Sequence, residues 1–205
     1  MSEPRGILPE HPPELSASLS HGEFLQLMAQ ANRKKFGLVS IDKRIDAPGF
    51  PKQTVTCTWM YSYMHSKEPS EITVLLDHEK QNIAAFQFIA GPDQRSGRIW
   101  RREHSFVREK KRGSNESIRG QGIGSYALRT AEDFIAALCI HDPRTPTVIE
   151  FSSSRPSVIQ FAHKNGYEFV STAHKKVFDE YLDEWKAHRE SEHTQNEENS
   201  PLFSL

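Results

Sequence analysis

The residues with the clearest capacity for chemistry form a glycine-rich turn, Arg119-Gly120-Gln121-Gly122-Ile123-Gly124-Ser125, which opens a segment of helical periodicity. Glycine has no Cβ atom, so several backbone N–H groups of such a turn can converge on an anion at the positive end of a helix. Proteins hold phosphate and pyrophosphate groups in this way. The alternative interpretation is a flexible glycine turn that only caps the helix.

Two other phosphate-binding motifs fit this turn less well. A dinucleotide-binding Gly-x-Gly-x-x-Gly turn would carry glycine where this chain has Ser125, and the strands before it are predicted to be antiparallel rather than parallel. A P-loop ends in Gly-Lys-Ser or Gly-Lys-Thr, and that ending is absent here. The turn is therefore a candidate anion site without either of these folds.

The elements that position the turn follow from hydrophobic periodicity and turn residues. Ser20 and Glu23 form a capping box that begins a helix ending near Gly37, and the segment 38–52, with prolines and a glycine, is predicted to be a loop. Residues 53–65 suit a helix or a strand, and their β-branched and aromatic content favours a strand. The other predicted elements are strands over 71–77, 82–90 and 98–107, a helix over 126–140, a strand over 147–151, a helix over 156–166, a strand over 167–172 and a helix over 177–185.

Length and composition limit the class of protein. The 205 residues are enough for one domain, expected over residues 20–188, with polar tails over 1–19 and 189–205 predicted to be disordered. Two cysteines without C-x-x-C spacing indicate neither a disulfide scaffold nor a four-cysteine zinc site. No signal peptide or membrane span is predicted, so we expect a cytoplasmic protein.

Charge is distributed unevenly along the chain. The net charge of −1 excludes a globally basic nucleic-acid binder, but residues 93–129 carry ten Lys or Arg against four Asp or Glu. Residues 179–205 carry two against eight. The central segment is therefore a candidate for contact with an anion, and the alternative is a solvated face that only keeps the protein soluble.

The glycine-rich turn and a later helix together resemble the GNAT superfamily of acyl-CoA-dependent N-acetyltransferases. Arg119, Gly122 and Gly124 match the family signature Gln/Arg-x-x-Gly-x-Gly/Ala, and the segment Arg155 to Tyr167 matches the frame of the family's Asn-Pro helix. The resemblance covers about residues 71–172. It implies an α/β fold of the α+β type, in which a mixed, largely antiparallel central sheet is flanked by helices.

The resemblance also implies acetyl-CoA as the co-substrate. The amides from Gln121 to Ser125 would bind the CoA pyrophosphate, and the end of the third strand would hydrogen-bond the pantetheine arm. The acyl carbonyl oxygen would meet a backbone amide near Phe106 or Val107, aimed at the charge of the tetrahedral intermediate. The implied cofactor-binding residues are Ser105, Phe106, Val107, Arg119, Gly120, Gln121, Gly122, Ile123, Gly124, Ser125 and Arg155.

An amine nucleophile needs a base, because an amine with an ordinary pKa of about 10.4 is protonated at neutral pH. The resemblance places that base on the third strand. Glu103 lies four residues before Val107 and has the parity to share its face, whereas His104 points oppositely unless a bulge intervenes. The alternative interpretation of Glu103 is a surface partner for Arg101 or Arg102.

Three features depart from the family pattern. Ala162 stands where the family has the tyrosine that protonates the leaving thiolate, and Arg155 stands where it has a pantetheine-contacting asparagine. The basic loop 108–118 is longer than its counterpart and is a candidate for the CoA 3′-phosphate or an acidic substrate. The helix predicted over 177–185 replaces the family's last strand.

The sequence thus predicts transfer of an acetyl group from acetyl-CoA to a primary amine on a small molecule, a peptide or a protein lysine. Two alternatives remain. One is a degenerate, non-catalytic fold that binds acyl-CoA or a protein, and the other is an acyltransferase that acts on nucleic acid through the basic loop. The histidines show no i, i+4 pair on a helix, so no metal site is predicted.

Overall fold

A mixed β-sheet organises the part of the chain that the computed structural model describes, namely residues 17–33, 37–62, 70–93, 97–111, 115–142, 145–170 and 173–177. Its eight strands lie in the order β1-β2-β3-β4-β5-β6-β8-β7. Neighbouring strands are antiparallel except for the parallel pair β5 and β6. The prediction of an α+β fold with a largely antiparallel sheet is confirmed. The elements are α1 (His21–Arg33), β1 (Leu38–Ile45), β2 (Val55–Ser62), β3 (Glu71–His78), β4 (Gln81–Asp93), β5 (Gly97–Val107), α2 (Ile123–His141), β6 (Val148–Phe151), α3 (Pro156–Lys164), β7 (Glu168–Val170) and β8 (Ala173–Val177).

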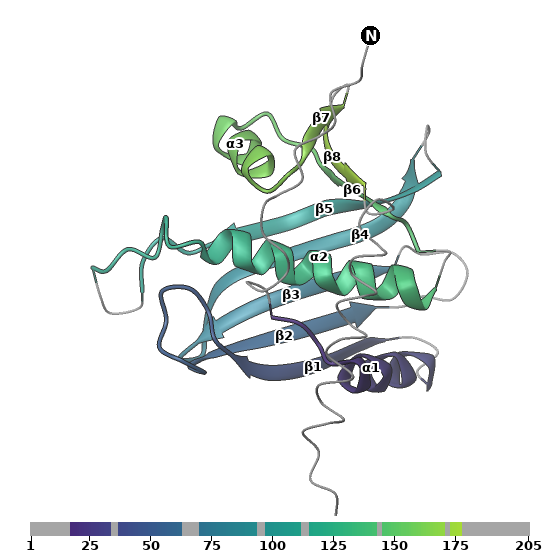
Figure 1. Cartoon of the computed structure of the whole chain (residues 1–205), viewed down its shortest axis with the longest axis horizontal. Helices are drawn as coiled ribbons and strands as arrows, with labels where there is room; N and C mark the ends of the chain where they lie inside the picture. Colours follow the sequence, from purple (N-terminus) through teal and green to yellow (C-terminus); the bar gives the residue numbers. More distant parts are fainter. Residues whose placement is uncertain are drawn as a thin grey trace, which may run out of the picture.

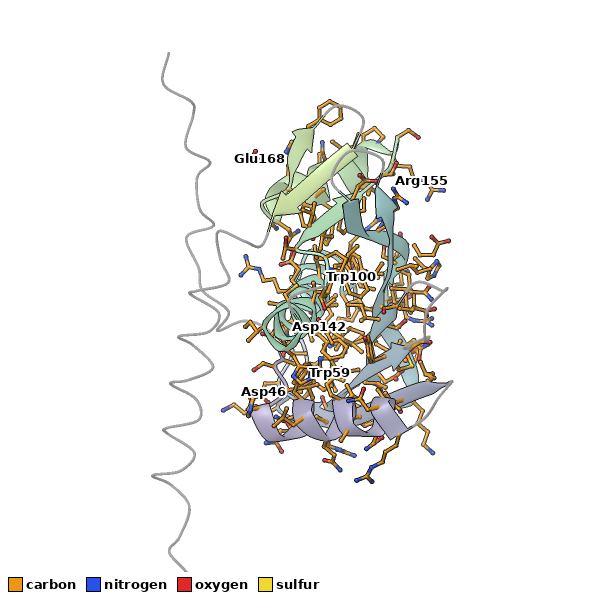
Figure 2. All side chains as sticks on the ribbon, turned by 90° about the vertical axis from the view of Figure 1, so that its right-hand side faces the viewer. Asp46, Trp59, Trp100, Asp142, Arg155 and Glu168 are labelled. Carbon is orange, nitrogen blue, oxygen red and sulfur yellow. The ribbon has the colours of Figure 1, made fainter. Side chains whose placement is uncertain are left out.

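The core lies between one face of the sheet and helix α2, which runs across that face (Figure 1). Trp59 of β2 and Trp100 of β5 are fully buried in this layer (Figure 2). Helix α1 packs on the same side near β1, where Phe24 meets Phe134 of α2 edge to face, with ring centroids 6.1 Å apart. The described helices therefore cover one face of the sheet.

The strand prediction for residues 53–65 is confirmed by β2, in which buried and partly buried residues alternate strictly. Val55, Cys57 and Trp59 face the core, and the residues between them are only partly buried. This is the pattern of a sheet with one covered face and one face turned toward solvent. The strands predicted over 71–77 and 82–90 are also confirmed, as β3 and β4, which pair antiparallel as a hairpin.

One predicted element is wrong, and the predicted start of another is wrong. The segment 38–52 was expected to be a loop, but its first half is strand β1, which pairs with β2 over its whole length. The prolines and the glycine that suggested a loop all lie beyond Ile45, in the connection to β2. The last helix was expected to begin at Val177, but that residue ends strand β8, which inserts between β6 and β7. Residues 178–185 lie outside the described residues.

The folded region also begins earlier than residue 20. Ala17 and Leu19 are buried, and the backbone N–H of Ala17 donates a hydrogen bond of 3.1 Å to the hydroxyl of Thr130 in α2. These contacts attach the chain before α1 to the central helix, so the predicted boundary is wrong by at least three residues, 20 against 17. Among the described helices, none combines the length and apolar composition that a membrane span requires.

The capping box at the start of α1 is confirmed. The Ser20 backbone N–H donates to the Glu23 carboxylate at 2.8 Å, and the Glu23 N–H donates to the Ser20 hydroxyl at 3.3 Å. Lys43 of β1 donates to the same carboxylate at 3.0 Å. Partial burial raises the pKa of Glu23, but the hydrogen bonds from Ser20 and Lys43 outweigh it and the net pKa is lowered.

We expect Glu23→Gln to lower the free energy of unfolding by about 0.5–1 kcal/mol at neutral pH, because it removes the charge that Lys43 and the helix start stabilise. A carboxyl group whose pKa is lower in the folded state contributes stability above its unfolded pKa and loses it as pH falls through the folded pKa. The difference between variant and parent should therefore vanish in acid. Urea unfolding across this pH range measures it, and Glu79→Gln in the β3–β4 turn is the matched control. An unchanged difference in acid would contradict the assignment.

Candidate functional site

The glycine-rich turn opens helix α2, which begins at Ile123 rather than at residue 126 as predicted. Gly120 and Gly122 have φ values of 82° and 86°, in the left-handed region that favours glycine. Gly122 is the N-cap, and its carbonyl oxygen accepts the first helical bond from the N–H of Tyr126 at 2.9 Å. The N–H groups of Ile123, Gly124 and Ser125 make no backbone hydrogen bond with any described residue. The turn therefore presents free donors at the positive end of a 19-residue helix.

The connection between β1 and β2 supports this turn from one side. The side chain of Gln121 lies directly over Gly49, so closely that a Cβ atom at Gly49 would collide with its amide group. The same amide donates to the carbonyl oxygen of Ser117 at 2.8 Å. The hydroxyl of Tyr126 donates to the carbonyl oxygen of Asp46 at 2.6 Å, and burial raises the pKa of this phenol far above its ordinary value. The shape of the turn therefore depends on a distant segment of the chain.

The basic loop 108–118 compensates part of its own charge. Lys111 pairs with Glu116 at 2.8 Å, and Arg119 pairs with Glu109 at 3.2 Å. A bridge between Lys110 and Ser117 closes the loop as a short hairpin. Arg112 lies outside the described residues. Of the charges that suggested an anion site here, those of Lys111 and Arg119 thus already have acidic partners.

Gly124 is the point at which three distant segments meet. A Cβ atom at this position would lie 3.0 Å from Cγ2 of Val107 at the end of β5 and 3.3 Å from Cε2 of Phe161 in α3. A side chain at this position would therefore be crowded by strand β5 and helix α3, whose side chains would have to shift by a few tenths of an ångström. The structure thereby brings together the three sequence segments in which the cofactor-binding residues were predicted.

We expect Gly124→Val to lower the free energy of unfolding by about 1–3 kcal/mol, because its side chain would push Val107 and Phe161 away. Gly22→Val in α1 is the matched control, since in the described part of the chain no atom beyond its neighbours and the adjacent helix backbone lies within 4 Å of a Cβ built there. It should be close to neutral, as valine is slightly better than glycine in a helix. Urea unfolding of both variants tests this, and equal effects would show that crowding at Gly124 is unimportant.

Strands β5 and β6 pair only briefly before they separate. Their parallel ladder consists of Trp100 with Ile149 and Arg101 with Glu150, although β5 continues to Val107. From Arg102 to Val107, β5 pairs with β4 on one side and with no described strand on the other. The second half of β5 therefore has an unpaired edge that leads to Gly124.

The register of β4 and β5 identifies which backbone groups occupy this edge. The N–H of Arg108 donates to the carbonyl oxygen of Ile83 at 2.8 Å. Because antiparallel pairs alternate between bonded and non-bonded, the backbone groups of Phe106 point to β4 and those of Ser105 and Val107 point to the unpaired edge. Of the two amides considered for the acyl carbonyl oxygen, the register therefore assigns Val107 to the open edge and Phe106 to the ladder.

A β-bulge interrupts the alternation from which Glu103 was selected. Gln87 of β4 pairs with His104 and Phe88 pairs with Arg102, so Glu103 is the extra residue. Beyond the bulge, Val107 shares the α2 face with Phe86, and His104 shares the opposite face with Phe106, the two rings being 6.3 Å apart. Strict alternation along β5 therefore no longer places Glu103 and Val107 on the same face of the sheet.

Glu103 is nevertheless exposed at the place where β5 and β6 separate. The alternative interpretation was an ion pair with Arg101 or Arg102, but Arg101 pairs with Glu150 at 3.7 Å and Arg102 bonds to Ser105 and Ser152. Among the described residues, Glu103 forms no ion pair. Its carboxylate is accordingly available to accept a proton.

The other predicted site residues occupy different surroundings. Arg155 is the exposed N-cap of α3, at the periphery of the molecule (Figure 2). Ala162, at the position of the family's tyrosine, is fully buried in the core. Ala162 has no hydroxyl group that could protonate a leaving thiolate. The next residue, His163, is exposed.

Sequence reasoning overlooked Arg102, which was considered only as a partner of Glu103. Its guanidinium spans the separating strands, donating to the hydroxyl of Ser105 in β5 at 3.1 Å and to the carbonyl oxygen of Ser152 after β6 at 3.2 Å. Burial, and then the charge of Arg155, lowers the pKa of this group. The sequence offered one signal. Arg102 lies two residues after Trp100, so in an alternating strand the arginine shares the face of the buried tryptophan.

Comparison with protein-family models and with curated proteins finds no match to this chain. Its function must therefore be inferred from its own residues.

Proposed function

We propose that this protein is an acyl-CoA-dependent N-acyltransferase of the GNAT type, which transfers an acetyl group from acetyl-CoA to a primary amine. The observation that carries this proposal is the unpaired edge at Ser105 and Val107, which leads to the glycine-capped start of α2. An extended ligand with amide groups can add to such an edge as a further strand would. A pyrophosphate at its end would then meet the free N–H groups of α2. Pantetheine joined to a nucleotide has this order of groups.

In this proposal the thioester lies along β5. The amine nitrogen attacks the thioester carbon, the carbonyl oxygen takes up negative charge, and a backbone N–H of the open edge of β5, which carries those of Ser105 and Val107, donates a hydrogen bond to it. Glu103 accepts the proton that the amine loses. The C–S bond then breaks and CoA leaves as a thiolate, whose ordinary pKa of about 8.5 makes an acid partner less important. This agrees with the fully buried Ala162 at the family's tyrosine position.

The second candidate is a non-catalytic acyl-CoA-binding module. Ala162 also favours it, because a fold that has lost its general acid retains the capacity to bind. Action on nucleic acid gains little support, since Lys111 of the basic loop and Arg119, which follows it, pair with acidic neighbours.

We expect acetyl-CoA to raise the melting temperature of the full chain. At 100 times its Kd, a ligand that binds only the folded state adds about 2.7 kcal/mol, which corresponds to about 5–10 °C for a domain of this size. Separate titrations with adenosine 3′,5′-bisphosphate and with pantetheine distinguish the two halves of the site. A melting temperature that does not change at millimolar acetyl-CoA would contradict both the enzyme and the binding module.

Labelled acetyl-CoA then separates these two candidates. The purified protein is incubated with it and a lysate, and the label is located by mass spectrometry. Label on amines that depends on the intact protein supports the transferase. Binding without transfer supports the module, and label on nucleic acid supports the remaining alternative.

A further inference from the structure

The strongest feature that the proposed function leaves unexplained is the cation between β5 and β6. Arg102 is half buried, and its guanidinium carbon lies 5.1 Å from the centroid of the Phe151 ring. It donates to Ser105 and Ser152, and its Nε atom is buried without a hydrogen-bond partner among the described residues. The side chain is therefore held in place from both strands, and its Nη1 and Nη2 atoms each use one of their two N–H groups in these bonds.

The charge of Arg102 lacks compensation. None of the described carboxylates forms an ion pair with it, and the charge that acts on its pKa is that of a second cation, Arg155, which lowers it in addition to the effect of burial. Removing a cation from water beside another cation is unfavourable unless an anion is bound there for part of the time. A guanidinium fork is the geometry that recognises a carboxylate through two parallel hydrogen bonds.

The position of Arg102 along β5 separates it from the pyrophosphate. Val107 contacts the position of Gly124 at the start of α2, Ser105 follows toward the bulge, and the Arg102 guanidinium contacts Ser105 from the far side. A ligand with its pyrophosphate at the glycine turn and its arm along this edge would bring its acyl end to Arg102. In that arrangement the cation of Arg102 would lie beside the acyl end.

We propose that Arg102, assisted by Arg155, binds a carboxylate carried by one of the two reactants of the acyl transfer. This assignment rests on the proposed function. The carboxylate has two sources: the far end of a dicarboxylic acyl group, as in malonyl-CoA or succinyl-CoA, or an acceptor that bears a carboxylate beside its amine. Both would complete the donor fork and neutralise the charge.

The acyl source is tested by calorimetric titration of the full chain with acetyl-CoA, malonyl-CoA and succinyl-CoA. If the acyl group carries the carboxylate, a dicarboxylic acyl-CoA should bind about 10- to 100-fold more tightly than acetyl-CoA. Arg102→Gln should reduce this affinity ratio to about one. Arg101→Gln removes the same charge from the neighbouring residue and should retain the parental ratio.

The acceptor source is tested with acetyl-CoA and pairs of amines that differ only in a carboxylate or its carboxamide. The carboxylate form should then have a KM about 10- to 100-fold lower in the parent, and Arg102→Gln should abolish the difference. If Arg102→Gln does not fold, Arg155→Gln at the exposed N-cap should lower the same preference.

The outcomes are distinct. A preference for a carboxylate in either experiment, lost with Arg102, supports the assignment. Binding of acetyl-CoA with no such preference in acyl group or acceptor overturns it and leaves the proposed function standing. Absence of CoA binding to the parent overturns both.

Discussion

Glu103→Gln should lower kcat by about 10²- to 10⁴-fold at neutral pH, which is the usual contribution of a general base. The substitution keeps the shape of the side chain and removes its capacity to accept a proton. Glu103 is the extra residue of the β-bulge, exposed where β5 and β6 separate, and it has no ion pair with a described residue. Acetyl-CoA affinity should be retained, because the carboxylate acts on the amine.

The pH profile distinguishes loss of a base from loss of structure. As pH approaches the amine pKa of about 10.4, the amine arrives deprotonated without assistance. The rate of the variant should therefore climb toward that of the parent. Steady-state kinetics with a fixed acceptor, at pH values up to that range, measure this convergence.

His104→Gln is the matched comparison, because His104 is the next residue but lies on the opposite face from Val107. It should change kcat much less. Parental kcat in Glu103→Gln at every pH would exclude Glu103 as the base. A large loss in His104→Gln would then identify the histidine in its place.

Gly122→Val should abolish the rise in melting temperature that acetyl-CoA causes. Gly122 has a φ of 86°, and a β-branched residue in the left-handed region costs about 1–2 kcal/mol, so the turn should rearrange. The first N–H groups of α2 would no longer converge on one point. Among the described residues other than its chain neighbours, Pro48 alone lies within 4 Å of a Cβ at this position, so the domain itself should remain folded.

Gly166→Val provides the matched control for backbone strain. Gly166 has a φ of 81° in the turn after α3, outside the proposed cofactor site. Both variants should lose similar stability in the absence of ligand, and only Gly122→Val should lose the ligand-induced shift. A retained shift in Gly122→Val would place the pyrophosphate elsewhere.

Local sequence signals were sufficient where one segment carries its own pattern. The capping box of Ser20 and Glu23, the alternation of β2 and the β3–β4 hairpin are determined by neighbouring residues, and each is confirmed. Strand β1 was missed because the prolines and the glycine beyond Ile45 led to a loop prediction for all of residues 38–52. Lys43 also occupies an inward position of the strand's alternation. That polar residue is tolerated there because its ammonium group pairs with Glu23 of α1, a contact between separate elements.

The sequence by itself determined the type and order of most elements and the glycine turn that caps α2, because helix caps and face patterns depend on residues a few positions apart. Only the tertiary structure decided how these elements form a site. The bulge at Glu103 moves the side chains of Ser105 and Val107 to the opposite face from the one that strict alternation along β5 predicts. One extra residue in a strand does not change the composition from which the strand is predicted. The approach of Gly124 to Val107 and Phe161, and the cation of Arg102 between two separating strands, depend on pairing between segments far apart in the chain.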